Sequence, residues 1–273
     1  MSFSAERPFA VVGAGKMGGA MIAGWMARGV DAASLLVVDP APSAALVAQL
    51  DSHGIAHASK VPEGVKAGMV LLAVKPQIMG DVLPGLKPAV ADDTLVLSVA
   101  AGTPVRTFEA AFGDIAVIRA MPNTPAMVGR GITALYPNAR VTAAQRETAG
   151  QLLSAIGAVE WLTSEEQIDL VTAVSGSGPA YVFLLAECLA EAGRRAGLPA
   201  DLAARLAEAT VSGAGELMHQ SDDTPGILRQ NVTSPNGTTA AALSVLMAEN
   251  GLQPLMDAAV EAAARRAREL AGS

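Results

Sequence analysis

The chain has 273 residues, of which 51% are hydrophobic, 16% are charged and only 3% are aromatic, and its formal net charge is −7. This length and apolar content predict two modest folded domains and argue against a disordered chain. The acidic balance and the scarcity of aromatic side chains argue against a nucleic-acid partner, whose phosphates and bases require basic stripes or stacking platforms.

The distribution of apolar residues and cysteine predicts a protein of the cytoplasm. Phe9 already belongs to the first predicted strand, so we expect no signal peptide, and we count no apolar run of the roughly 18 residues that span a bilayer. The single Cys188 lies in an apolar helical stretch, where we expect it to be buried. His53, His57 and His219 lack the spacing of metal ligands, so no metal site is predicted.

The first 162 residues alternate between short apolar runs and helical patterns. Predicted strands cover residues 8–12, 35–39, 69–74, 94–99, 115–120, 132–136 and 158–162, and predicted helices cover 16–28, 43–53, 77–83, 103–112 and 143–156. Strands that are apolar on both faces and separated by helices indicate a mainly parallel sheet covered on both sides. The predicted fold class is therefore α/β, with a doubly wound Rossmann-type domain over residues 1–162.

Strand signals stop after Thr163, so residues 163–273 are predicted to form an all-helical domain. Its helices are expected at 164–174, 179–196, 199–220, 239–249 and 253–270. The helix that begins at Pro179 is apolar on nearly every face and must be covered on all sides. It is either an internal core helix or part of a subunit interface. We favour the interface, because five Ala-rich helices have little bulk to enclose it.

A glycine motif follows the first predicted strand. In Gly13-Ala-Gly15-Lys-Met-Gly18, the first glycine would make the turn, the second would let the backbone approach a pyrophosphate, and the third would let helix and strand pack closely. Asp39 ends the next strand, where an acidic side chain binds the adenosine ribose and repels a 2′-phosphate. A purely structural turn is the alternative. The predicted cofactor-binding residues here are Gly13, Gly15, Lys16, Met17, Gly18 and Asp39.

Three later segments also follow predicted strands, at residues 73–77, 98–102 and 119–125. In an open parallel sheet the ligand crevice lies beyond the carboxyl ends of the strands, so these segments should meet there. Lys75 would reach the ribose or phosphate, and the small side chains of Ala100 and Ala101 would let a nicotinamide ring lie flat. Each segment alone also fits an ordinary loop. The predicted cofactor-binding residues here are Lys75, Pro76, Ala100, Ala101 and Asn123.

Two segments in the helical part suggest a substrate site. Residues 230–240 are rich in hydroxyl side chains and lead into an apolar helical pattern, and a helix start of this kind suits a small carboxylate. Residues 175–179 form a second Gly/Ser turn at a helix start, with Ser177 as a candidate substrate contact. The alternative for this second segment is a simple helix cap followed by Pro in the first turn.

Six motifs together resemble the pyrroline-5-carboxylate reductase family, in that family's order and over nearly the whole chain. They are Gly13-Ala-Gly-Lys-Met-Gly18, Val74-Lys-Pro-Gln77, Ser98-Val-Ala-Ala-Gly102, Arg119-Ala-Met-Pro-Asn-Thr-Pro125, Ser175-Gly-Ser-Gly-Pro-Ala-Tyr181 and Val232-Thr-Ser-Pro-Asn-Gly-Thr-Thr239. The last motif is the most specific, because generic dinucleotide-binding proteins lack it.

The resemblance implies an enzyme that reduces 1-pyrroline-5-carboxylate to L-proline with NADPH or NADH, the last step of proline biosynthesis. It also implies that the helical domain is of the 6-phosphogluconate dehydrogenase-like type and dimerises, with rings of dimers as a further assembly. Carried over to matching positions, Ser234, Gly237, Thr238 and Thr239 would hold the substrate carboxylate. Thr239 would also bond the ring nitrogen, which makes it the candidate catalytic residue.

Two positions depart from the family pattern, and two other functions remain open. Asp39 stands where NADPH favours hydroxyl or basic groups, so we expect NADH to serve at least as well as NADPH. Asn236 replaces the first glycine of a common Pro-Gly-Gly motif. The alternatives are another NAD(P)-dependent imine or β-hydroxyacid oxidoreductase and a non-catalytic dinucleotide sensor. A β-hydroxyacid dehydrogenase would use a lysine in the helical domain, whereas this chain has none after Lys87.

Overall fold

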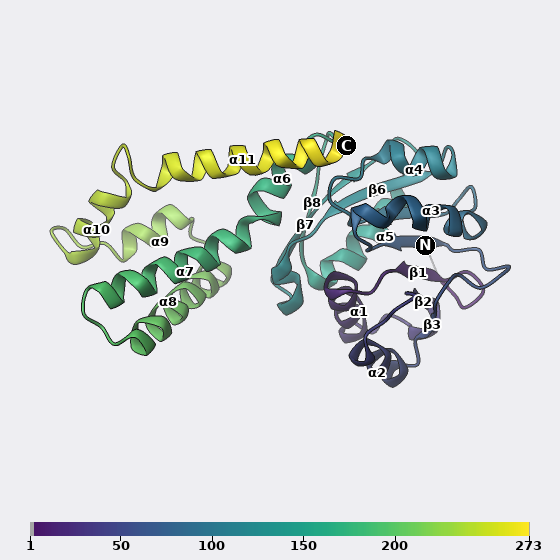
Figure 1. Cartoon of the computed structure of the whole chain (residues 1–273), viewed down its shortest axis with the longest axis horizontal. Helices are drawn as coiled ribbons and strands as arrows, with labels where there is room; N and C mark the ends of the chain where they lie inside the picture. Colours follow the sequence, from purple (N-terminus) through teal and green to yellow (C-terminus); the bar gives the residue numbers. More distant parts are fainter. Residues whose placement is uncertain (1–2, 273) are drawn as a thin grey trace. The chain divides into compact units, whose positions relative to one another are not determined.

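The computed structural model describes residues 3–272 and divides the chain into two compact units (Figure 1). The sheet unit comprises the chain up to Gly176 and again from Ala263 on, and the helical unit comprises Ser177–Ala262. The last strand ends at Trp161, close to the predicted boundary at residue 162, but the sheet unit does not end there. It continues because α6 (Gln167–Val171) and the last turns of α11 (Leu252–Gly272) pack on it.

The sheet has eight strands in the order β3-β2-β1-β4-β5-β6-β7-β8. They are β1 (Phe9–Val12), β2 (Leu35–Val38), β3 (Ala56–Ala58), β4 (Met69–Leu72), β5 (Leu95–Ser98), β6 (Ala116–Met121), β7 (Gly131–Pro137) and β8 (Gly157–Trp161). The first six in this order pair in parallel, whereas β7 runs antiparallel to β6 and parallel to β8. Six parallel strands in the order 3-2-1-4-5-6 are typical of a dinucleotide-binding sheet. This strand order confirms the predicted fold class.

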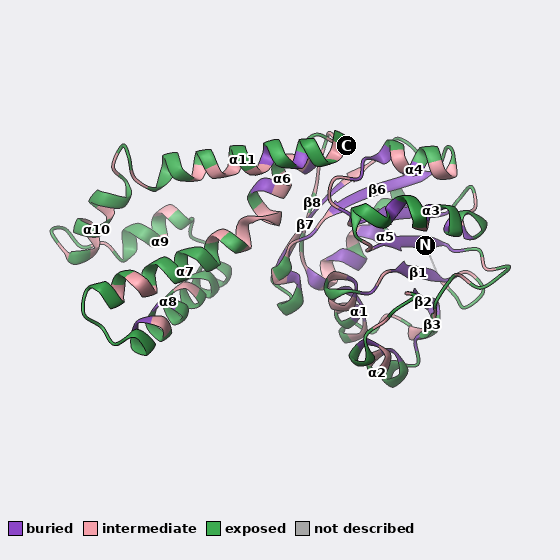
Figure 2. Cartoon of the chain, viewed as in Figure 1, coloured by how far each residue is buried: buried purple, intermediate pink, exposed green. Residues whose placement is uncertain are grey.

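Helices cover both faces of the sheet. The elements α1 (Lys16–Ala27), α2 (Ala44–His53) and α5 (Ala143–Leu153) bury one core, and α3 (Met79–Leu86) and α4 (Val105–Phe112) bury the other. The first core centres on Trp25, whose indole N–H donates to the Leu152 carbonyl oxygen at 2.8 Å. The central strands are buried along their whole length (Figure 2). Burial on two faces explains why these strands are continuous apolar runs in the sequence.

The helical unit contains α7 (Gly178–Arg195), α8 (Ala200–Gln220), α9 (Pro225–Asn231), α10 (Thr238–Leu246) and the first part of α11. A π-helical turn, Thr172–Gly176, joins α6 to α7. The helix α7 packs along α8, where Ala203 and Ala207 are buried. Four of these helices were predicted, and α9 was not.

The apolar surface of α7 is not covered within one chain. Phe183 is 62% exposed and Leu184 is 57% exposed, and none of the eighteen residues of α7 is buried (Figure 2). Cys188, expected to be buried, is exposed on the same helix. By length and composition alone, the helical stretch Gln167–Arg195 is able to cross a membrane, so the expectation that no run is long enough is wrong. Within the helical unit α7 is therefore not an internal core helix, and its exposed apolar side chains favour the interface that we predicted.

Candidate active site

The glycine loop lies between β1 and α1, and each of its three glycines is needed for a different reason. Gly13 has φ +80°, a conformation that favours glycine, and a Cβ there would lie 3.0 Å from the Ala73 carbonyl oxygen. A Cβ on Gly18 would lie 2.6 Å from the Gly13 carbonyl oxygen. A Cβ on Gly15 would meet no described atom within 4 Å. The open space above Gly15, at the first turn of α1, fits a dinucleotide pyrophosphate.

Asp39 ties the glycine loop to the turn that follows β2. One carboxylate oxygen accepts the Ala14 N–H at 3.0 Å, and the other accepts the Ala41 N–H at 2.9 Å. The Asp39 carboxylate is therefore fixed in orientation beside the loop that the phosphates would approach. It presents negative charge where the sequence predicts the adenosine ribose.

A cavity of about 250 Å³ lies next to Asp39, between the ends of β1 and β2 and the helix α3. Its walls are mostly apolar and include Val38, Pro40 and Val74. Ser59 and Lys60 also line it, and both directly follow β3. Neither residue was predicted from the sequence, because the strand before them, β3, was not predicted. An apolar slot with a few polar groups at its rim suits the adenosine half of the cofactor.

The other cofactor segments follow β4, β5 and β6, whose carboxyl ends lie side by side in the sheet. Lys75 is exposed and precedes the short helical turn Pro76–Ile78. Ala100 is buried, and its N–H donates to Ser98 Oγ at 3.2 Å. The Asn123 side-chain oxygen accepts the Ile132 N–H at 3.0 Å, so this residue also fastens the start of β7. The fold thus brings the predicted cofactor residues to one edge of the sheet.

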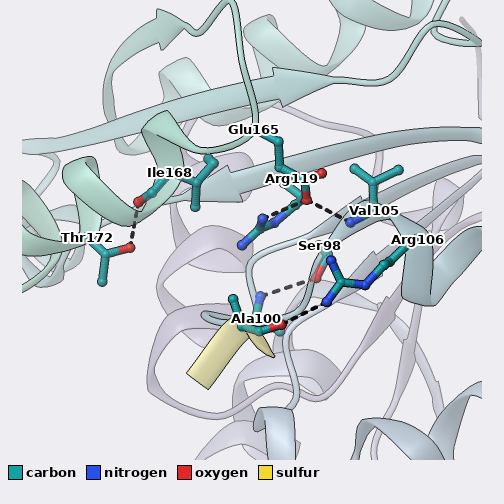
Figure 3. Close-up of polar contacts among 9 residues, drawn as sticks. Ser98, Ala100, Val105, Arg106, Arg119, Glu165, Ile168 and Thr172 are labelled. Atoms are coloured by element: carbon teal, nitrogen blue, oxygen red, sulfur yellow. Dashed lines mark hydrogen bonds and ion pairs between the residues drawn. The ribbon is translucent and has the colours of Figure 1, made fainter. Parts of the chain in front are cut away.

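A partly buried ion pair, absent from the sequence predictions, joins β6 to the segment just before α6 (Figure 3). The Arg119 guanidinium on β6 donates from Nη1 to Glu165 Oε1 at 2.7 Å. The same carboxylate oxygen accepts the N–H of Val105, the first residue of α4, at 2.8 Å. On α6, burial raises the pKa of Asp169, while the positive charges of Arg119 and Arg268 act against that increase.

The predicted substrate residues of the helical unit form a tight turn before α10. The Gly237 N–H donates to the Ser234 carbonyl oxygen at 3.1 Å, and a Cβ on Gly237 would overlap Ser234 Oγ. Asn236 has φ +59°, which explains why a residue other than glycine is tolerated there: asparagine is among the side chains most often found in that conformation. Gly237 is the N-cap of α10, so its missing side chain leaves the N–H groups of Thr238 and Thr239 for a ligand.

The two groups of predicted site residues belong to different units. All predicted cofactor residues lie in the sheet unit, whereas Ser177 and the segment 234–239 lie in the helical unit. Ser177 is the N-cap of α7, and its carbonyl oxygen accepts the Ala180 N–H at 3.0 Å. Among residues 3–272, no group of three His, Cys, Asp or Glu side chains is arranged to hold a metal ion.

Two family models match this chain, one in each part. Residues 165–270 match the model described as pyrroline-5-carboxylate reductase dimerisation. Residues 8–102 match the model described as NADP oxidoreductase, coenzyme F420-dependent. The second match covers the glycine loop, Asp39 and the segment that ends at Gly102, and the first covers the turn before α10.

Named relatives match the chain over both units. The pyrroline-5-carboxylate reductase of Pseudomonas aeruginosa is 46% identical over 96% of this chain and 96% of its own length. A solved pyrroline-5-carboxylate reductase from Coxiella burnetii has a TM-score of 0.89 and 36% identity, and covers 97% of this chain and 98% of its own. A solved Plasmodium falciparum pyrroline carboxylate reductase with NADP bound has a TM-score of 0.80 and 28% identity, with 98% and 99% covered.

Proposed function

The chain belongs to the pyrroline-5-carboxylate reductase family, and we propose that it reduces 1-pyrroline-5-carboxylate to L-proline with NAD(P)H. The observation that carries this conclusion is the full-length match to the Pseudomonas aeruginosa relative, which spans the cofactor segments and the hydroxyl-rich turn alike. The chain is thus an oxidoreductase with a dinucleotide-binding sheet unit and a helical dimerisation unit.

The residues of the sheet unit fit a nicotinamide dinucleotide. The open space above Gly15 and the first turn of α1 would hold the pyrophosphate, and the cavity beside Asp39 would hold the adenosine half. Lys75 and Pro76 would hold the ribose and phosphate beyond β4. Ala100 and Ala101 would carry the nicotinamide ring. When bound, the reduced nicotinamide supplies the hydride, and the protein contributes orientation and electrostatics.

The substrate carboxylate would lie at the start of α10. Ser234 and the first-turn N–H groups after Gly237 supply hydrogen-bond donors, and the positive end of the helix dipole favours an anion there. Ser177, at the start of α7, would add a second hydroxyl. A cyclic C=N carbon accepts a hydride readily only when its nitrogen is protonated or strongly hydrogen-bonded. The Thr239 hydroxyl would donate that hydrogen bond, which makes Thr239 the catalytic residue of the proposal.

Replacement of the Thr239 hydroxyl tests the proposal directly. Thr239→Ala should lower kcat/KM by roughly 10- to 1000-fold, which corresponds to about 1.4 to 4 kcal/mol, and leave NAD(P)H binding nearly unchanged. Thr239→Ser should recover much of the loss. Ser244→Ala is the matched control, because it removes a hydroxyl from the exposed side of the same helix. Normal turnover in Thr239→Ala, or loss of cofactor binding along with activity, would contradict the assigned role.

The assembly proposed is a homodimer in which the apolar surface of α7 is covered by a second copy of the chain. The dimerisation family model covers this helix, and exposed Phe183 and Leu184 supply the apolar area that a dimer would bury. We place the protein in the cytoplasm and not in a membrane, with rings of dimers as a larger form. Light scattering of protein purified without detergent decides the matter. A monomeric mass with full activity, or a requirement for detergent, would refute it.

A further inference from the structure

The segment from Ala100 to Pro104 links β5 to α4 and carries the two alanines assigned above to the nicotinamide ring. Its first residue is buried and bonded to Ser98 Oγ. In the middle, Gly102 has φ +70°, which a side chain would strain. At the far end, Pro104 is the N-cap of α4 and has no side-chain oxygen with which to cap it. The helix that follows this segment, α4, therefore needs a capping group from elsewhere in the fold.

Glu165 supplies that capping group. It lies just before α6, 60 residues further along the chain than Val105. Its Oε1 atom accepts the Val105 N–H at 2.8 Å, so a carboxylate stands at the positive end of α4. Arg119 Nη1 donates to the same atom at 2.7 Å, and the Arg119 side chain is only 5% exposed (Figure 3). Because Arg119 is enclosed on β6, it holds the Glu165 carboxylate in one place. The start of α4 is thereby held in a fixed position relative to the neighbouring strand β6.

The last turn of α11 holds the same segment from another side. A Cβ on Gly102 would lie 3.2 Å from Leu270 Cβ and 3.3 Å from the Leu270 carbonyl oxygen. Arg106 Nη2, on the first turn of α4, donates to the Ala271 carbonyl oxygen at 3.1 Å. The segment is thus fixed in its middle as well as at its two ends, and a change at one point is passed to the alanines between them.

We propose that Glu165 is a positioning residue for hydride transfer: through the N–H of Val105 it fixes the Ala100–Pro104 segment on which the nicotinamide ring lies. This inference rests on the proposed function, which assigns Ala100 and Ala101 to that ring. Hydride transfer is sensitive to small displacements, so a misplaced ring slows the reaction. The adenosine half of the cofactor is bound elsewhere, by the glycine loop and the cavity beside Asp39, and does not depend on Glu165.

The test compares two probes that differ only in the nicotinamide. Binding of the reduced cofactor and of ADP-ribose (or 2′-phospho-ADP-ribose, if NADPH is the cofactor used) is measured by calorimetry for wild type, Glu165→Ala and Glu165→Gln. Glu165→Ala should weaken cofactor binding about 5- to 30-fold and leave the ADP-ribose analogue within about twofold. It should also lower kcat by at least about tenfold and raise the deuterium isotope effect of a 4-deuterated cofactor. Glu165→Gln keeps an acceptor for Val105 and should recover most of the loss.

Glu166→Gln is the matched control, because Glu166 is the next residue and its side chain is exposed. Should Glu165→Ala fail to fold, Val105→Pro attacks the same hydrogen bond from its other side. Proline is favoured at the first position of a helix, and Pro104, with ψ 160°, already has the conformation required before a proline. In Val105→Pro the proline ring replaces the N–H, whereas Val105→Ala shortens the side chain and keeps the N–H. The difference between these two variants therefore isolates the hydrogen bond to Glu165.

Equal weakening of both probes, or unchanged binding and kcat in Glu165→Ala, would overturn the inference, as would equal behaviour of Val105→Pro and Val105→Ala. Failure of the proposed function is a different result. In that case wild-type protein fails to oxidise NAD(P)H when 1-pyrroline-5-carboxylate is added. The ratio of the two binding constants still reports on Glu165 in that event, since it requires no turnover.

Discussion

The two members of the Arg119–Glu165 ion pair are unequally buried, and this predicts that removing one is costlier than removing the other. The Arg119 side chain is 5% exposed and the Glu165 side chain is 27% exposed. Glu165→Ala leaves a guanidinium enclosed without its carboxylate. Arg119→Met leaves a carboxylate that keeps the Val105 N–H and part of its hydration. The same pair is lost in both variants, but the group left behind differs.

The expected magnitudes follow from that difference. At an N–O distance of 2.7 Å and an effective dielectric constant near 20, the attraction is about 6 kcal/mol before desolvation. A stranded buried charge typically costs about 3–5 kcal/mol, and Asp169 nearby offsets some of it, so we expect about 3 kcal/mol for Glu165→Ala. For Arg119→Met we expect about 1 kcal/mol, because the methionine fills apolar space and the carboxylate can turn toward water.

Urea unfolding at one fixed protomer concentration measures both values, because the stability of an oligomer depends on concentration. Arg205→Met and Asp201→Ala provide the comparison, since that pair on α8 is 65% and 72% exposed. Each should cost at most about 0.5 kcal/mol. Equal losses for Glu165→Ala and Arg119→Met, or a larger loss for Arg119→Met, would refute the reasoning from burial.

Three further outcomes are expected. Asp39→Asn removes the negative charge beside the cavity proposed for the adenosine half of the cofactor, so the ratio of kcat/KM for NADPH to that for NADH should rise at least about tenfold in steady-state assays. Gly18→Ala places a Cβ 2.6 Å from a carbonyl oxygen of the glycine loop, so fluorescence titration should show NAD(P)H binding weakened more than about tenfold; an unchanged Kd would contradict this. Hydrogen bonds from Arg194 and Arg195 lower the pKa of Glu191 to about 2. The stability from this group is therefore present above its ordinary pKa and is lost as pH falls toward 2, and Glu191→Gln should flatten that part of an acid-unfolding curve.

Strand and helix periodicity was enough to predict most of the sheet, because buried parallel strands are apolar on both faces. It missed β3, whose three residues Ala-His-Ala lie at the edge of the sheet and include two that are exposed. It missed α9 as well, a seven-residue helix that begins Pro225-Gly226. Cys188 shows a further limit: an apolar helix has the same pattern whether its cover comes from its own chain or from a second copy.

The candidate site divides in the same way. Gly13 to Gly18 could be predicted because the residues that shape the loop are contiguous: Gly13 has a positive φ, and Gly18 lies where a Cβ would meet the Gly13 carbonyl oxygen. The pairing of Arg119 with Glu165 could not, because 46 residues separate them and only the packing of α6 against β6 brings them together. Lys60 was not predicted for a related reason, since its place at the cavity depends on the unpredicted strand before it. Local motifs can be predicted from the sequence, whereas contacts created by tertiary packing cannot.

The division of the chain also bears on the order in which the protein matures during synthesis. In chain order the sheet unit both precedes and follows the helical unit, because it also includes the segment from Ala263 on. Domains generally fold as units as the chain is made, N-terminal parts first. Here the nucleotide-binding unit can gather its strands early, but Gly102 and Arg106 acquire their contacts with Leu270 and Ala271 only after the entire helical unit has been translated. The segment from Ala100 to Pro104 thus gains these contacts only after residues 177–262 have been made, so a product that stops within the helical unit lacks them.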